Sequence, residues 1–342
     1  MRFAKTILLT GAGFTKTFGG FLGSEMWAAI FNQPEVREDN KLREYMLRGD
    51  LNFEAVYERV IFSPDPEFDA LQRVLFSKAV QTAYRDMDQR IYEQVVADQA
   101  GFASCSRHFI SRFAERQDSR AFVFTLNQDI LMERFFSTNH FLPSLPGFSA
   151  FPHWFNNRID ENLRTDQFVA VPDAKEIEKA RESFWEKSPC GFMYVKLHGS
   201  YGWRSTNGAD KMIIGHGKLG RIAGEPLLEW YLSLFKEALE EGDKNLVIVG
   251  YGFGDDHIND IIADAIKDRG LKLFVISPQL PADFAQLLQG VSGSNPVLIN
   301  QGHEIRNGLH GYYPAKVSDF YYPNEEVLPA LALDFFNALE LN

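Results

Sequence analysis

Five short apolar runs, each followed by small or polar residues, constrain the fold of this 342-residue chain more than any other feature. They are Thr6–Thr10, Ala121–Leu126, Phe192–Leu197, Leu246–Gly250 and Leu271–Ser277. Such runs, rich in β-branched and aromatic residues, are typical of strands that are buried on both faces of a sheet. Residues 226–241 and 257–269 carry apolar side chains at helical spacing between the later runs. Because strand, helix and strand alternate, the sequence predicts an α/β fold with a doubly wound, mostly parallel sheet.

Residues 33–118 show a different pattern, in which charged and apolar positions alternate at helical spacing with few interruptions. We therefore expect a helical insertion between the first two strands. The main domain would then comprise residues 1–32 and 119–300, and residues 301–342 would form a C-terminal packing or oligomerisation segment.

Composition narrows the class of protein further. The net charge of −11 argues against a protein that coats nucleic acid, so we expect no direct sequence-specific nucleic-acid binding. Two cysteines, Cys105 and Cys190, cannot build a four-thiolate zinc site or a disulfide framework. The chain has no signal-like N-terminus and no apolar run of about 18 residues, so we expect a cytoplasmic protein without a membrane span.

The first strand ends in Gly11-Ala12-Gly13, a turn that suits close approach of the backbone to a phosphate. A helix starting near Thr15 would point free N–H groups at that phosphate. The full dinucleotide fingerprint is absent, because Lys16 stands where the third glycine belongs. The motif therefore fits either a nucleotide site or an ordinary strand-turn-helix.

Polar residues also follow the second and third strands. Asn127 and Asp129 would stand at the carboxyl edge of the sheet, where parallel sheets bind ligands. Alternatively, Asp129 caps the next helix. His198 follows the third strand and is the side-chain type best suited to proton transfer near neutral pH. A structural role for His198 is the competing interpretation.

The last two strands end in the same manner. Val249-Gly250-Tyr251-Gly252 leads through Asp255 and Asp256 into a helix, and either acid would serve as its cap. We expect His257 and Asn259, at the start of that helix, to be structural or on the surface. Ser277 closes the last strand. If the five strands are neighbours, all five motifs meet at one crevice.

This ordered set of motifs (GAGFT, TLNQD, KLHGS, VGYGFGDDHIN and ISP) resembles the sirtuin fold, and more closely the sirtuin-like NAD hydrolases of bacterial anti-phage defence. The resemblance implies a Rossmann-like sheet in which the GAG turn binds NAD phosphates. It also implies that Asn127 and Asp129 hold the nicotinamide ribose and that His198 is catalytic. The residues that would bind NAD+ are Gly11, Ala12, Gly13, Phe14, Thr15, Asp129, Gly250, Gly252, Phe253 and Ser277, and the catalytic pair is Asn127 and His198.

The implied reaction cleaves NAD+, as substrate, to ADP-ribose and nicotinamide without zinc. Protein-deacylating sirtuins usually carry a four-cysteine zinc module, which this chain cannot build. An NAD or ADP-ribose sensor without turnover and a protein deacylase remain the alternatives.

An uncontrolled NAD hydrolase would exhaust its own cell, so the resemblance also implies control. About 65 residues follow Ser277, which is few for a separate sensor domain. We therefore expect a partner protein in trans, a HerA-like ATPase or alternatively an Argonaute-like protein. Homo-oligomerisation would use C-terminal aromatic side chains, unless these pack a C-terminal helix onto the core. These side chains are Tyr312, Tyr313, Phe320, Tyr321 and Tyr322.

Overall fold

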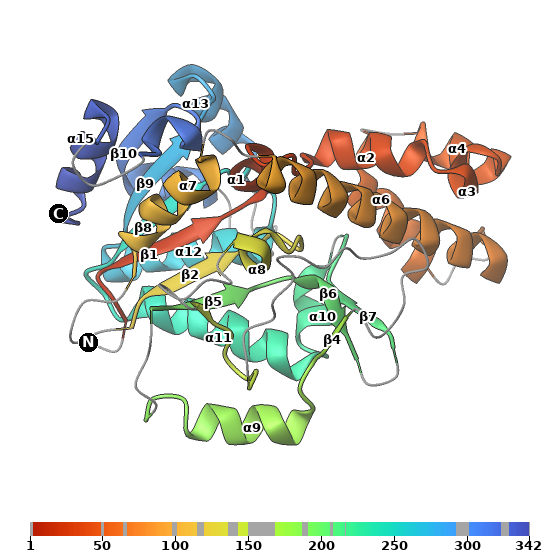
Figure 1. Ribbon diagram of the computed structural model, residues 1–342, viewed down its shortest axis with the longest axis horizontal. Coiled ribbons are helices and arrows are strands. Elements are labelled where there is room, and N and C mark those ends of the chain that lie inside the picture. Colours follow the sequence, from red (N-terminus) through yellow and green to blue (C-terminus); the bar gives the residue numbers. More distant parts are fainter. Residues whose placement is uncertain are drawn as a thin grey trace.

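The computed structural model describes residues 3–48, 51–63, 67–97, 101–114, 120–135, 143–149, 168–186, 191–205, 208–215, 217–291, 301–322 and 328–341. Its centre is a seven-stranded sheet in which every described strand pair is parallel (Figure 1). The strands, in order across the sheet, are β10 (Leu309–Pro314), β9 (Lys272–Ser277), β8 (Asn245–Val249), β1 (Thr6–Thr10), β2 (Phe122–Thr125), β5 (Phe192–Lys196) and β3 (Pro143–Ser144). The predicted fold, doubly wound and mostly parallel, is confirmed.

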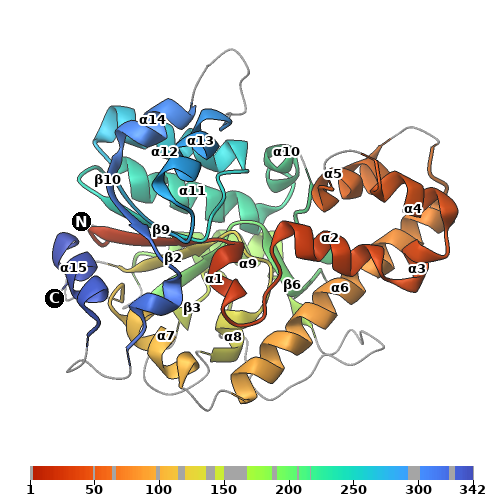
Figure 2. The ribbon, with the colours of Figure 1, turned by 90° about the horizontal axis from the view of Figure 1, so that it is seen from above.

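Helices cover both faces of this sheet (Figure 2). One face carries α11 (Pro226–Glu240), α12 (Asp256–Arg269), α13 (Pro281–Gln289) and α14 (Gln301–Asn307). The other carries α1 (Ala12–Lys16), α7 (Phe102–Ser111), α8 (Leu131–Phe135) and α15 (Ala330–Ala338). The sheet strands β1, β2, β5 and β8 are fully buried, which explains their uninterrupted apolar sequences.

An arm of helices extends sideways from the sheet in both views (Figures 1 and 2). It consists of α2 (Gly23–Phe31), α3 (Pro34–Arg37), α4 (Asn40–Met46), α5 (Phe53–Tyr57), a π-helical turn (Glu58–Phe62) and α6 (Ala70–Val96). Helix α6 begins with a capping box in which Asp69 and Gln72 satisfy each other's backbone N–H groups. The described elements between β1 and β2 are thus helical, while the predicted domain boundaries stay predictions.

A small second sheet lies beside the main one and positions the third motif. Its strands, in spatial order, are β4 (Val169–Ala170), β6 (Gly199–Arg204) and β7 (Asp210–Met212). Helix α9 (Ala174–Glu182) follows β4 in the chain and α10 (Lys218–Ile222) follows β7. Because β6 begins one residue after His198, that histidine sits in the tight turn that joins the two sheets.

The C-terminal segment contributes a strand to the main sheet that the sequence analysis did not predict. Strand β10 adds an edge strand beside β9, and its mixed sequence LHGYYP concealed it. Four of the five aromatic side chains expected at an oligomer surface are buried within the chain, at 9% exposure or less: Tyr313, Phe320, Tyr321 and Tyr322. They pack against one another and against Phe109 of α7 or Phe335 and Phe336 of α15. The alternative, in which these rings pack the C-terminal helix onto the core, describes them better.

A helix that crosses a bilayer needs a long apolar stretch, and none of the helices within the described ranges provides one.

Candidate functional site

A cavity of about 930 Å³ opens at the carboxyl edge of the main sheet. All five strand-end motifs contribute to its wall, which confirms that they meet at one crevice. Its lining includes Gly11, Ala12, Gly13, Asn127, Gln128, His198, Gly250, Gly252 and Ser277. The chain leaves β1 towards β2 on one side and later occupies β8 on the other side of β1. The cavity therefore lies at the point where strand order reverses, as ligand sites of open parallel sheets do.

The glycines of the first motif allow the turn after β1 to lie in contact with the loop after β8. A Cβ atom on Gly11 would lie 2.6 Å from the carbonyl oxygen of Gly250, and one on Gly13 would lie 2.7 Å from its Cα. The N–H groups of Gly11 and Gly13 donate to the carbonyl oxygens of Val249 and Gly250, each over 2.9 Å. These two N–H groups are therefore not available to a phosphate. Helix α1 begins at Ala12, not near Thr15 as predicted.

Asn127 lies against this turn at the cavity wall. Its Nδ2 donates to the carbonyl oxygen of Gly11 and to the hydroxyl oxygen of Thr15, each over 2.9 Å. The amide therefore fixes the end of β2 to the turn after β1. Both donor hydrogens of the amide are used in these two contacts, which leaves its oxygen as the atom to act on a ligand.

Four of the predicted NAD-binding residues do not line the large cavity: Phe14, Thr15, Asp129 and Phe253. Phe14 and Phe253 are buried in the core at 3% exposure. Thr15 and Asp129 line a smaller cavity of about 130 Å³, which also contacts Ala12 and Asn127.

Asp129 has the capping role that the sequence offered as an alternative, and it also faces the small cavity. Its carboxylate accepts a hydrogen bond from the N–H of Leu131, at 3.0 Å, and is hydrogen bonded to Thr15. Burial raises the pKa of Asp129, although the nearby Lys196 opposes this.

A buried ion pair holds the loop after β2 that carries Asn127 and Asp129. The ammonium group of Lys196 lies 2.9 Å from a carboxylate oxygen of Glu133, and both side chains have 0% exposure. Lys196 also donates to the carbonyl oxygen of Asp129. Burial raises the pKa of Glu133 despite this partner. A lysine in the third motif thus holds the second motif in place.

His198 is buried at 2% exposure in the wall of the large cavity. Burial lowers its pKa well below 6.5, although the carboxylate of Asp255 opposes this. The ring is therefore neutral at pH 7 and has one nitrogen that can accept a proton. Its Nε2 lies 3.1 Å from Nε2 of His257 and 4.0 Å from a carboxylate oxygen of Asp255.

Sequence reasoning missed two members of this group. His257 was expected to be structural or on the surface, and Asp255 to be a helix cap. Asp255 is the N-cap residue of α12 by position, but its side chain makes no capping hydrogen bond. Its carboxylate instead accepts from Lys218 at 2.6 Å. The repeated acids and histidine directly after the glycine loop were the only sequence signal.

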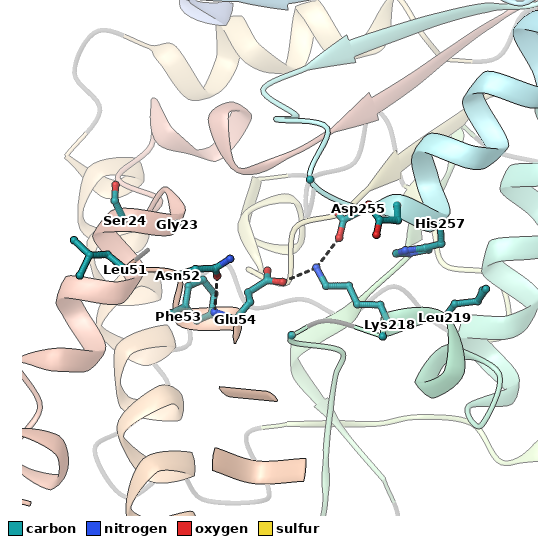
Figure 3. Close-up of a pocket in the computed structure, with 14 residues that line it drawn as sticks. Gly23, Ser24, Leu51, Asn52, Phe53, Glu54, Lys218, Leu219, Asp255 and His257 are labelled. Atoms are coloured by element: carbon teal, nitrogen blue, oxygen red, sulfur yellow. Dashed lines mark hydrogen bonds and ion pairs between the residues drawn. The ribbon is translucent and has the colours of Figure 1, made fainter. Parts of the chain in front are cut away.

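Lys218 links the helical arm to this group (Figure 3). Its ammonium group lies 2.8 Å from Glu54 of α5 and 2.6 Å from Asp255. Burial alone would raise the pKa of Asp255, but His198 and Lys218 lower it to about 2. A second cavity of about 610 Å³ adjoins this ion chain. Glu54, Lys218 and Asp255 line both cavities, whereas His257 lines only the second of the two.

His198, Asp255 and His257 are the group of described residues whose donor atoms lie close enough, within 4.8 Å of one another, to hold a metal ion. The Lys218 ammonium already occupies the Asp255 oxygen and would repel a cation there. We therefore assign no metal to this group. Cys105 lies half-buried in α7 and lines none of the cavities described above, and Cys190 lies outside the described residues.

Comparison with known protein families shows which family the chain belongs to. The model of the SIR2-like domain matches residues 121–292, which contain the second to fifth motifs. The chain belongs to the SIR2-like family. SIR2-like domains bind NAD+ and are in general NAD-dependent enzymes, so NAD-related activity is compatible with the cavity. No curated protein matches the chain.

Proposed function

We propose that this SIR2-like protein is an NAD+ glycohydrolase, which cleaves NAD+ to ADP-ribose and nicotinamide. The observation that carries the proposal is the neutral, buried His198 facing the same cavity as Asn127. The volume of about 930 Å³ is at the upper end of the roughly 300–1,000 Å³ of small-molecule sites. A cavity of this size suits a dinucleotide.

The reaction breaks the bond between nicotinamide and the ribose. Nicotinamide leaves as a neutral molecule, so the ribose carbon develops oxocarbenium character, as in glycoside hydrolysis. A neutral His198 is ready to accept a proton from a water molecule or a ribose hydroxyl. The side-chain oxygen of Asn127 would orient the ribose or that water. We assign the nicotinamide ring to the small cavity of about 130 Å³ beside Asn127, where Asp129 offers polar contacts.

Incubation of purified protein with NAD+, followed by separation of the products, tests the proposal. Equal amounts of ADP-ribose and nicotinamide support it. Replacement of the base in His198→Ala should lower turnover by about 100- to 10,000-fold, and Asn127→Ala should also abolish cleavage. Circular dichroism of both variants checks that they fold. Near-normal turnover in both variants contradicts the mechanism.

The same assay separates the alternatives. Measurable NAD+ binding without turnover would indicate a sensor. Product that forms only with an acylated peptide would indicate a deacylase. The Asn127 and His198 pair favours turnover over pure sensing, and the two cysteines of the chain cannot form the zinc module usual in deacylases.

We further propose that the protein is an effector of bacterial anti-phage defence that acts by NAD+ depletion, with a HerA-like ATPase as partner in trans and an Argonaute-like protein as the alternative. Support for this part comes from the resemblance of the motif set. The test is NAD+ content after phage infection of cells that carry the gene with or without each partner. Unchanged NAD+ and unchanged phage yield in every combination contradict it.

Self-association is proposed through the helical arm instead of the C-terminal aromatic rings. Among the described residues, five of the nine exposed large apolar side chains lie on the arm: Leu47, Leu51, Phe62, Leu71 and Val74. The double variant Leu71→Asp, Val74→Asp should lower the mass measured by light scattering without a change in secondary structure. Wild-type protein that is monomeric at high concentration removes this proposal.

A further inference from the structure

Two histidines from distant parts of the chain form a bridge between the two cavities. His198 comes from the turn between β5 and β6, and His257 from the first turn of α12. Their Nε2 atoms lie 3.1 Å apart across 59 residues of sequence. His198 lines the large cavity. His257 lines the second cavity, where Figure 3 shows it, and does not line the first.

A hydrogen bond between two neutral imidazoles needs one ring to donate and the other to accept. The pair therefore already has the geometry for a proton to pass from one Nε2 to the other. No rearrangement of either side chain is needed, because 3.1 Å is hydrogen-bond distance.

NAD+ hydrolysis creates the need for such a transfer. The bond between the ribose carbon and the nicotinamide nitrogen breaks, and its electron pair stays on the nitrogen. The oxygen of water bonds to the ribose carbon and loses one proton, so each turnover releases one proton. The base that accepts it must shed it before the next turnover. His198 has 2% exposure, and substrate or product occupies the cavity that it faces.

Asp255 and the backbone of Leu126 favour a charged His198, whereas burial and the ammonium group of Lys218 oppose it, so an imidazolium at this position is short-lived. The groups that act on the two rings are Asp255, Lys218, Asp256 and Asp260. Asp255 lies 4.0 Å from His198 and stabilises a passing positive charge. Its carboxylate is bonded to Lys218, whose own second partner is Glu54 of the arm. Asp255 is therefore held as an ion and does not need to accept the proton itself.

We propose that His257 is a proton relay, which takes the proton from His198 and releases it into the second cavity. The proposal rests on the proposed NAD+ hydrolysis and adds an exit route to it. In this arrangement His198 accepts the proton at Nδ1 and passes the proton on its Nε2 to Nε2 of His257, which releases its own Nδ1 proton into the second cavity. Both rings return to their starting tautomers before the next turnover, so His198 acts on the substrate and His257 acts through His198. The second cavity serves as the aqueous side of the relay.

The test is steady-state NAD+ hydrolysis by His257→Ala with and without added imidazole. We expect kcat to fall at least about 10-fold, less than the roughly 100- to 10,000-fold effect of removing a general base, because His257 acts only through His198. The KM for NAD+ should stay unchanged, because His257 does not line the large cavity. Imidazole should restore kcat in a saturable manner by entering the space vacated beside the second cavity. In His257→Phe a ring fills that space, so imidazole should have no effect.

The controls separate failure of the relay from failure of the proposed function. His310→Ala, an exposed position on β10, should leave kcat unchanged. Wild-type protein that does not cleave NAD+ overturns both proposals. Wild-type cleavage with an unchanged kcat in His257→Ala overturns the relay alone. If His257→Ala does not fold, kcat of His257→Gln is measured instead, without imidazole. A fall in kcat supports the relay, and an unchanged kcat overturns it.

Discussion

The side-chain amide of Asn127 is held by the hydroxyl of Thr15 across 112 residues of sequence, with 2.9 Å between Nδ2 and Oγ1. The same Thr15 side chain is hydrogen bonded to Asp129. One hydroxyl on the short helix α1 therefore sets the position of two polar residues at the end of β2.

Replacement of that hydroxyl tests its positioning role. Thr15→Val keeps the shape of the side chain and removes both hydrogen bonds, so we expect turnover of NAD+ to fall by up to about 100-fold through misplacement of Asn127. The loss of stability should stay near 1 kcal/mol, the net value of a typical hydrogen bond. Kinetics and urea unfolding measure the two effects. Thr15→Ser keeps the hydroxyl and should retain most activity; equal loss in both variants would show that the hydroxyl is not what matters.

Gly250 should tolerate no side chain. It has φ of +67°, and an added Cβ would lie 2.4 Å from the backbone nitrogen of Phe14 and 2.5 Å from Cα of Gly13. We expect Gly250→Ala to lose at least about 2 kcal/mol of unfolding free energy, from the left-handed backbone and the overlap with backbone atoms. Thermal unfolding gives the measurement.

Gly252 offers a matched control in the same loop, since an added Cβ meets nothing within 4 Å and its φ is not positive. Gly252→Ala should change stability little. A Gly250→Ala variant as stable as Gly252→Ala would contradict the described contact between the GAG turn and the loop after β8.

The buried pair of Lys196 and Glu133 predicts a non-additive response. Lys196→Met leaves the Glu133 carboxylate buried without its counter-charge, which typically costs about 3–5 kcal/mol of stability. The double variant Lys196→Met, Glu133→Leu removes both charges and should recover most of that loss. Denaturant unfolding of the two variants measures the difference. A double variant less stable than Lys196→Met alone would show that the ion pair is not the source of the effect.

The strands of the sheet were predictable because burial on both faces leaves an uninterrupted apolar sequence. The predicted strand Thr6–Thr10 has the same bounds as β1. The predicted strand Leu246–Gly250 overlaps β8 and is shifted from it by one residue. Edge strand β10 is only partly buried, so its sequence mixes polar, glycine and aromatic residues and gives no such run. For the aromatic rings near the C-terminus the sequence leaves two interpretations open, an oligomer surface or packing of the C-terminal helix, because sequence records side-chain type and not its neighbours.

A position at the cavity wall was predictable where a polar residue closely follows a strand, as Asn127 and His198 do, each two residues after the last residue of β2 or β5. Asp255 and His257 depend on partners 37 and 59 residues away, Lys218 and His198, so local sequence could not assign their roles. Glu54 comes from the arm, which carries no motif at all. Phe14 and Phe253 stand within motifs but are buried at 3% exposure, so their part in NAD+ binding stays a prediction.

The pH dependence of unfolding tests the neutral histidine pair. Burial lowers the pKa of His198 well below 6.5 and lowers that of His257, so the unfolded chain binds more protons than the folded chain below pH 6.5. The unfolding free energy must therefore fall as pH drops from about 6.5, by up to about 1.4 kcal/mol per pH unit for each ring. Asp255, with its pKa lowered from 3.8 to about 2, adds a further loss below pH 3.8, because its ionised form is stabilised only in the folded chain.

Urea unfolding between pH 7 and pH 4.5 measures this dependence. The slope of unfolding free energy against pH should be shallower for the double variant His198→Gln, His257→Gln than for wild type, whereas exposed His310→Gln should keep the wild-type slope. Equal slopes in all three proteins would mean that the two rings are not held neutral.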